Sequence, residues 1–234
     1  MTNNDEFETF LYVSNDNISI SVRKKYKDDR YYENASKLIN NLNDRNLSQL
    51  NEFLDLNIIK IERSLKKFVK KIILIIDHQE LLKIKLSIKK KFYGDLIDKE
   101  SLVSLLNTAR NQVKESHKGI SITHMVIDNY NIDGKFFSFL PQNMRCHNLC
   151  LDINFICFSE NFLMKIKESL NRYQIEIQRI LSASYLRDNF KNSTVDIYSM
   201  GQKIIEGHNS NEILFVSKTM KNMGFFEKFF NFFN

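Results

Sequence analysis

Four residues between positions 146 and 157 belong to the types that serve as zinc ligands in proteins. Cys146, His147, Cys150 and Cys157 offer three thiols and one imidazole. Structural zinc sites pair their ligands roughly two to four residues apart and add a second pair elsewhere, whereas here Cys146 and His147 are adjacent and no second pair follows. We therefore interpret them as structural thiols, and no metal or cofactor is expected.

The sequence lacks the signatures of nucleophilic, zinc-dependent and nucleotide-dependent catalysis. G-x-S-x-G, H-E-x-x-H, a Walker loop and G-x-G-x-x-G do not occur. Asp77 follows the apolar run 72–76, but no phosphate loop accompanies it, so we interpret it as a turn residue. His124 lies in an apolar run and is interpreted as a core histidine. No catalytic residue is predicted, and the chain is not expected to be an enzyme.

Basic residues are concentrated between positions 60 and 91. This stretch holds eleven Lys and Arg against three acidic residues, in a chain whose net charge is +6. Solvated faces of a helix and a strand would account for them, and lipid headgroups or nucleic acid are the alternative partners. Nucleic acid is not expected, because no aromatic-interleaved RNA motif accompanies the cations. The predicted basic patch consists of Lys60, Arg63, Lys66, Lys67, Lys70 and Lys71.

The last ten residues, 225–234, contain six phenylalanines and no other apolar side chain; we call them the Phe-rich end. At about 100° per residue, all six fall on one side of a helical wheel. This apolar face would bury in a bilayer surface, in a partner's groove or in the chain's own core. The lysines before it favour the bilayer surface. The predicted membrane-binding residues are Phe225, Phe226, Phe229, Phe230, Phe232, Phe233, Lys218, Lys221 and Lys228.

Composition indicates a folded cytoplasmic protein. The chain has 234 residues, 43% of them hydrophobic and 26% charged, which supports a substantial core. Three cysteines fit a reducing compartment. No apolar stretch reaches the roughly 20 residues that span a bilayer, and the acidic N-terminus does not resemble a signal peptide.

The first 80 residues predict a strand meander, a helix and a buried strand. Residues 7–14, 17–24 and 30–36 have the pattern of strands, and 72–76 is a short apolar run typical of a strand buried on both faces. Apolar spacings of three and four predict a helix over 47–68. Its stripe consists of Leu47, Leu50, Leu54, Ile58, Ile61, Leu65 and Phe68.

Strand and helix patterns alternate through the rest of the chain. Asp98 is the expected N-cap of a helix, and Asp133-Gly134 is a strong hairpin turn pair. The predicted strands are 82–88, 120–130, 135–140, 149–158, 175–181 and 212–217, and the predicted helices are 99–117, 160–172 and 195–206.

This order of elements resembles the first half of the actin-type ATPases, and in particular the FtsA family of bacterial cell-division proteins. The run ITHMVIDNYNIDGK at 122–135 resembles a strand and turn of that family, 151–186 resembles its strand-helix-strand, and YSMGQKIIEG at 198–207 resembles its late helix. The resemblance implies an α+β chain: half of an actin-like (ribonuclease H-type) fold with an inserted β-α-β-β subdomain and a C-terminal amphipathic helix. The implied domains are an actin-like core at 1–80 and 157–217, an inserted interaction subdomain at 81–156, and a tether with a membrane helix at 218–234.

The sequence departs from this family where nucleotide would bind. Ser14-Asn15-Asp16-Asn17 replaces the first phosphate loop, no D-x-G-G-G motif follows, and the second half of the actin fold is expected to be missing. Phosphate loops need glycine so that backbone N–H groups can approach the phosphate oxygens. The prediction is therefore a non-catalytic, membrane-associated adaptor of the division machinery on the cytoplasmic face of the inner membrane.

The resemblance also implies partners. These are the anionic lipid surface, other copies of the chain, and division proteins that contact 81–156. The tubulin-like ring protein is a doubtful partner, because the family carries that docking site in the second half. Two alternatives stay open: a degenerate actin-like nucleotide-binding protein and a basic nucleic-acid-binding protein.

Overall fold

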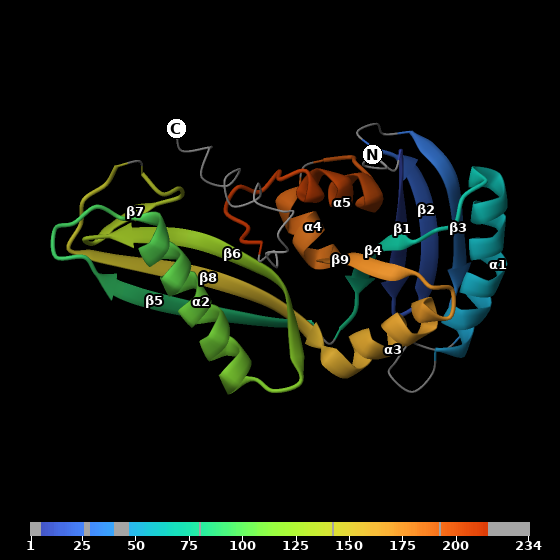
Figure 1. Ribbon diagram of the computed structural model, residues 1–234, viewed down its shortest axis with the longest axis horizontal. Coiled ribbons are helices and arrows are strands. Elements are labelled where there is room, and N and C mark those ends of the chain that lie inside the picture. The colour runs from blue at the N-terminus through green and yellow to red at the C-terminus, as the bar shows by residue number, and fades with distance from the viewer. Residues whose placement is uncertain are drawn as a thin grey trace. The chain divides into compact units, whose positions relative to one another are not determined.

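The structure is a computed structural model that describes residues 6–25, 29–39, 47–79, 81–141, 143–191 and 193–214. The chain divides into two compact units (Figure 1). Unit 1 comprises the described residues of Met1–Leu81 and Phe158–His208. Unit 2 comprises those of Leu82–Cys157 and of the segment that begins at Asn209.

Unit 1 is built on a five-stranded mixed sheet with the order β3-β2-β1-β4-β9. The first three strands form an antiparallel meander, and β4 and β9 continue the sheet parallel to β1. The strands are β1 (Phe7–Ser14), β2 (Asn17–Lys24), β3 (Arg30–Lys37), β4 (Lys71–Asp77) and β9 (Glu176–Ser182).

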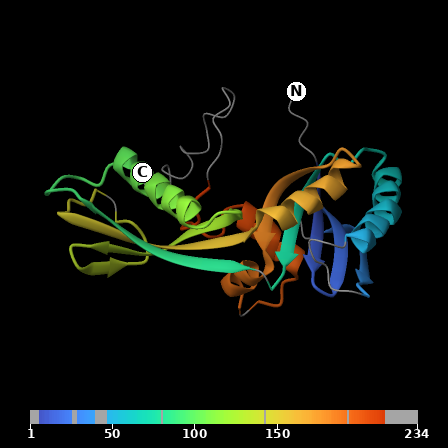
Figure 2. The same ribbon diagram turned by 90° about the horizontal axis from the view of Figure 1, so that it is seen from below.

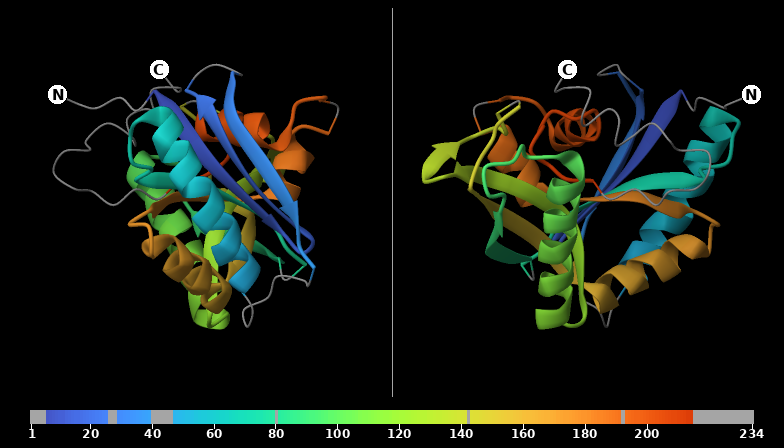
Figure 3. Two further views of the ribbon diagram at one scale, coloured as in Figure 1. Left: turned by 90° about the vertical axis from the view of Figure 1, so that its right-hand side faces the viewer. Right: turned by 60° about the vertical axis from the view of Figure 1, so that its left-hand side comes forward.

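Helices cover both faces of this sheet (Figures 1 and 3). On one face, α1 (Ser48–Leu65) and α3 (Glu160–Asn171) pack on Leu74 and its neighbours to form the larger core. Successive strand residues point to opposite faces, so Ile75 faces the other way and meets α5 (Ile197–Ile205) at Gly201. The short helix α4 (Ala183–Asn189) connects β9 to this second layer.

Unit 2 is a four-stranded sheet with the order β5-β8-β6-β7 and one long helix, α2, packed on it (Figure 2). Asp98 caps α2 by accepting a hydrogen bond from the Ser101 N–H. The segment after Asn209 lies along β6, where the Ile213 N–H donates to the carbonyl of Met125. The elements are β5 (Leu82–Lys91), α2 (Lys99–Ser116), β6 (Ile120–Ile132), β7 (Lys135–Phe137) and β8 (Asn148–Ser159).

The predicted fold class is confirmed for the described residues. The chain is α+β, and the sheet of unit 1 has the strand order and directions of one ribonuclease H-type half of an actin-like fold. The predicted C-terminal amphipathic helix lies outside the described residues. None of the described helices is both long and apolar enough to cross a membrane.

Several predicted elements differ from the observed ones. Helix α4 was not predicted, and the strand predicted over 135–140 stops at Phe137. Where a strand was predicted over 212–217, Glu212 forms only an isolated bridge with Val126, and residues 215–217 lie outside the described part of the chain.

Candidate functional site

The carboxyl ends of β1, β4 and β9 meet at one edge of the unit 1 sheet. Ser14 at the end of β1 is opposite Asp77 at the end of β4, and Ser182 at the end of β9 is opposite Ile76. In open sheets with parallel strands, ligands bind outside these carboxyl ends. A nucleotide site, if the chain has one, is therefore expected at this edge.

The turn between β1 and β2 is closed on its own side chains. The hydroxyl of Ser14 accepts a hydrogen bond from the Asn17 N–H at 2.9 Å and lies 2.9 Å from a carboxylate oxygen of Asp16. The first glycine of the sequence is Gly94, so every residue of this turn carries a Cβ. The acidic, glycine-free turn does not form the open cradle of N–H groups that a phosphate needs.

Asp77 is held by two partners from within unit 1. Its Oδ2 accepts a hydrogen bond from the Tyr12 hydroxyl at 2.7 Å and one from the guanidinium of Arg187 at 2.6 Å. Burial alone would raise the pKa of Asp77, but these bonds outweigh it and leave the pKa below its ordinary value. Burial and the adjacent carboxylate raise the pKa of Tyr12 to about 12, so the phenol stays protonated.

Helix α4 brings Arg187 to this edge of the sheet. Ser182 ends β9 and caps α4, because its hydroxyl accepts a hydrogen bond from the Tyr185 N–H. One turn later, the guanidinium of Arg187 reaches Asp77, so the carboxylate at the end of β4 is paired with a cation of the chain itself. Together with the hydrogen bond from Tyr12, this ion pair joins β1, β4 and α4 at one edge of the sheet.

The three cysteines considered as zinc ligands differ in burial. Cys146 and Cys157 are buried and Cys150 is partly buried, and all three are free thiols. Burial raises the pKa of the Cys157 thiol to about 11, which keeps it protonated. Among the described residues, no group of three or more His, Cys, Asp or Glu side chains could hold a metal ion.

His124 occupies a core position in unit 2. It is 1% exposed, and its Nδ1 lies 2.8 Å from a carboxylate oxygen of Glu212. The pair joins β6 to the segment that follows Asn209. Sequence reasoning identified the buried histidine but not its partner, which lies 88 positions away.

The basic patch lies at the opposite end of β4 from Asp77. Lys60 and Arg63 are on the last turns of α1, Lys66 and Lys67 follow it, and Lys70 and Lys71 lead into β4. All six side chains are exposed. Within the described parts of the chain, none of them forms an ion pair with a carboxylate.

Phe68 corrects one sequence prediction. It was assigned to the buried stripe of a helix over 47–68, but it is 81% exposed. The helix ends at Leu65 because Lys66 adopts a left-handed backbone conformation with φ 53°, and Val69 takes the buried position instead at 6% exposed. No glycine or proline in the sequence marks this helix end.

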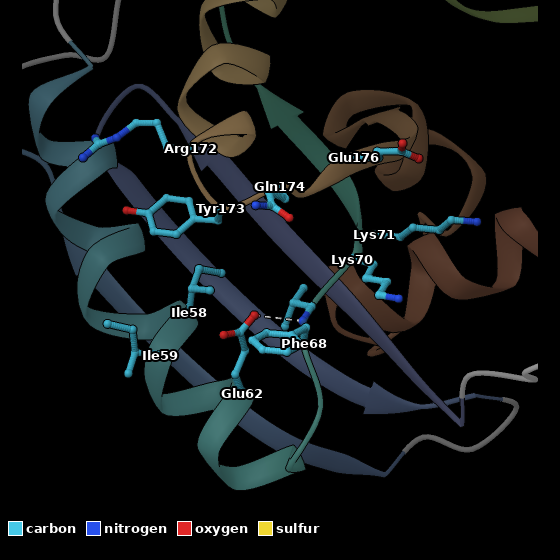
Figure 4. A pocket seen from close by; sticks show the side chains of 11 residues that line it. Ile58, Ile59, Glu62, Phe68, Lys70, Lys71, Arg172, Tyr173, Gln174 and Glu176 are labelled. Carbon is cyan, nitrogen blue, oxygen red and sulfur yellow. Dashed lines mark hydrogen bonds between the residues drawn. The ribbon is translucent and has the colours of Figure 1, made fainter.

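Phe68 lies beside a groove between the end of α1 and the turn from α3 to β9 (Figure 4). The groove has a volume of about 560 Å³. Its lining residues are Ile58, Ile59, Glu62, Phe68, Val69, Lys70, Lys71, Arg172, Tyr173, Gln174 and Glu176. Sequence reasoning found the cations of this surface but missed its apolar component.

The predicted membrane-binding residues cannot be placed in the fold. Phe225, Phe226, Phe229, Phe230, Phe232, Phe233, Lys218, Lys221 and Lys228 lie outside the described residues. Their assignment stays a prediction.

Comparisons with known proteins find similarity only at the level of structure. No known protein family matches the sequence, and no curated protein matches it. The "PilM-PilN type IV pilus biogenesis complex" aligns with a TM-score of 0.47 and 5% identity, over 76% of this chain and 48% of that chain.

Two further solved structures align less well. The cytoplasmic domain of EpsL, an inner membrane component of the type II secretion system of Vibrio cholerae, has a TM-score of 0.36 and 10% identity, over 77% of this chain and 57% of that chain. A Bacteroides thetaiotaomicron protein with an actin-like ATPase fold has a TM-score of 0.33 and 14% identity, over 82% of this chain and 59% of that chain.

The chain spans only about half of the length of the first of these structures and somewhat more of the others. Because all three TM-scores are low, the fold of unit 1 is assigned from its own strand order and strand directions.

Proposed function

We propose that this chain is a non-catalytic adaptor that attaches to the cytoplasmic face of the inner membrane. The observation that carries the proposal is the engaged carboxylate at the end of β4, where Asp77 pairs with Arg187 at 2.6 Å beside a glycine-free turn. Unit 1 then has the sheet of an actin-like half, but the carboxyl ends of its strands form no cradle for phosphate. Its function then rests on surfaces that contact other molecules.

The proposed attachment to the membrane rests on the Phe-rich end. Six phenylalanines on one side of a helical wheel, preceded by Lys218 and Lys221, have the composition of an interfacial anchor for anionic lipid. Two copies in one oligomer would bind more strongly than one, because the second attachment becomes intramolecular.

The proposed protein contacts rest on exposed aromatic residues of unit 2. Tyr93, Phe136 and Phe139 are 79%, 68% and 63% exposed. Backbone hydrogen bonds hold the loops at this end of the unit together, since the Gly94 N–H donates to the carbonyl of Cys146. We assign self-association and contacts with division proteins to this surface, within the predicted insert 81–156. A role in bacterial cell division, like that of the FtsA family, is part of the proposal; docking to the tubulin-like ring protein is not.

Lipid attachment is tested by sedimentation of the full chain with liposomes containing phosphatidylglycerol. Phe229→Glu is expected to release the protein, because it places a charge on the apolar face. Asn231→Glu adds the same charge on the polar face and is expected to sediment like the unchanged protein. Equal sedimentation of both variants would reject the anchor.

The adaptor role is tested separately. Labelled ATP is expected not to bind at millimolar concentration, and saturable binding would instead support the degenerate nucleotide-binding alternative. A fluorescent fusion in the host bacterium is expected at the division site. Uniform membrane fluorescence would agree with the proposed membrane attachment and would reject the proposed role in cell division.

A further inference from the structure

The groove beside Phe68 combines a concave shape with apolar walls. Ile58 and Ile59 of α1 form one side, Tyr173 of the α3–β9 turn forms another, and Phe68 also lines the groove (Figure 4). Ile59 is 49% exposed, and Leu56, one turn earlier on the same side of α1, is 62% exposed. Apolar surface that is contiguous and rimmed by polar residues marks interaction sites.

The backbone holds Phe68 in its exposed position. On one side, the Lys66 N–H donates to the carbonyl of Glu62 and ends α1. On the other side, the Val69 N–H donates to the side chain of Glu62 at 3.0 Å, and the side chain of Val69 is buried. The backbone on both sides of Phe68 is therefore already ordered, so a partner that covers the ring need not order this segment of the chain, which favours binding.

The charges around the groove are mainly positive. Its lining contains three cations, Lys70, Lys71 and Arg172, against the carboxylates of Glu62 and Glu176, and Arg172 lies 3.9 Å from the carboxylate of Asp55. The adjoining end of α1 and the two residues after it add further exposed cations. These are Lys60, Arg63, Lys66 and Lys67.

Charge and shape together select the occupant. The tether and membrane helix predicted at 218–234 carry three lysines and one glutamate, so the net charge of this segment has the same sign as that of the groove, and charge complementarity does not favour it as the occupant. An anionic bilayer matches the sign, but its flat surface does not fill a hollow. A peptide segment with acidic residues satisfies both conditions.

We propose that this groove binds a segment of a partner protein in which a large apolar side chain is flanked by acidic residues. The apolar side chain packs against Phe68 and Ile59, and the acidic residues contact Lys67 and Lys70. This docking site is independent of membrane attachment, of unit 2 and of any role in cell division.

Selection from a displayed library of random 16-residue peptides against the full chain tests the proposal. The enriched peptides are expected to combine acidic residues with Phe, Leu, Ile or Trp. Fluorescence anisotropy with one enriched peptide should show at least a tenfold loss of affinity in Phe68→Ala and in Lys67→Glu/Lys70→Glu. The matched controls are Met164→Ala, at an exposed apolar residue of α3 that does not line the groove, and Lys89→Glu/Lys91→Glu, at two exposed lysines of β5; both should bind like the unchanged protein.

Each remaining outcome overturns the proposal. An absence of enriched peptides, or enriched peptides that bind Phe68→Ala as well as the unchanged chain, removes the docking site. If Phe68→Ala releases the protein from anionic liposomes, the groove faces lipid. If Phe229→Glu raises peptide affinity tenfold, the chain's own Phe-rich end occupies the groove. Because Phe68 is exposed, the thermal unfolding midpoint of Phe68→Ala should equal that of the unchanged protein. A loss of peptide binding in this variant is then not caused by a loss of folding.

Discussion

An ion pair between the buried Arg23 and the partly exposed Asp196 joins α5 to the sheet of unit 1. Arg23 projects from β2 and is 1% exposed. Its two terminal nitrogens lie 3.0 and 2.9 Å from the two carboxylate oxygens of Asp196, which also caps α5. Ser199 of α5 accepts a further hydrogen bond from Arg23 at 2.6 Å.

Replacing Asp196 with Asn removes the negative charge and retains a good helix cap. Breaking a fully buried ion pair from one side costs about 3–5 kcal/mol, because the other charge stays buried. The Asp196 side chain is 40% exposed, Ser199 still accepts a hydrogen bond from Arg23, and Glu33 still lies 3.5 Å from the guanidinium, so the loss should be smaller. We expect Asp196→Asn to lower the free energy of unfolding by about 2–3 kcal/mol and the thermal midpoint by roughly 5–10 °C.

Thermal and urea unfolding of the full chain, followed by circular dichroism, measures this loss. The matched control is Asp188→Asn, which breaks an exposed ion pair with Lys191 at 3.6 Å and should cost less than about 0.5 kcal/mol. A second variant, Asp196→Asn combined with Arg23→Met, should recover part of the loss, because it also removes the buried guanidinium. Equal midpoints for Asp196→Asn and Asp188→Asn would refute the reasoning.

The same ion pair predicts a pH dependence. Burial alone would raise the pKa of Asp196, but the hydrogen bonds from Arg23 and Ser199 lower it below the ordinary value of 3.8. The folded state therefore binds its proton less readily than the unfolded state. The stabilisation is fully present above the ordinary pKa and is lost as the pH falls through the lower, folded value. In Asp196→Asn this part of the acid destabilisation should disappear.

Three further outcomes follow from single contacts. Glu212→Ala removes the carboxylate beside buried His124 and should cost about 1–3 kcal/mol, with faster hydrogen exchange of the β6 amides; unchanged exchange would contradict it. At Gly201 a Cβ would lie 3.2 Å from a methyl of Leu181. Gly201→Val should therefore lower the free energy of unfolding by about 1–3 kcal/mol through overpacking. In Gly201→Ala, the gain in helix propensity of about 1 kcal/mol should offset the close contact. An NMR titration should place the pKa of Asp77 below 3.8, in the direction set by its hydrogen bonds.

The parts of the fold that were predictable are those in which burial repeats along the chain. The five apolar residues Ile72–Ile76 are all buried, as a central strand covered on both faces requires. The helix stripe through Leu50, Leu54, Ile58 and Ile61 faces the core for the same reason. In each case, whether a residue is buried can be predicted from the apolar residues that lie one helical turn or one strand repeat away in the sequence.

The parts that were missed depend on contacts that local spacing does not encode. Phe68 continues the helix stripe at the correct spacing, but the left-handed conformation of Lys66, a residue type without special preference for it, turns the chain before Phe68 can reach the core. Helix α4 has seven residues, too few to establish an apolar repeat. Arg187 and Asp77 are 110 positions apart, so only the assembled sheet brings them together.

The two ends of β4 present different surfaces. At its carboxyl end, Asp77 is engaged by Tyr12 and Arg187, and the neighbouring turn is closed. At its amino end, exposed cations border a groove with an exposed aromatic residue. A ligand site requires groups whose interactions are not already satisfied within the protein, because only these gain free energy from a partner. By this criterion the amino end of β4, with its exposed cations and the exposed Phe68, is a better candidate for recognition than the edge where Asp77 is engaged by Tyr12 and Arg187.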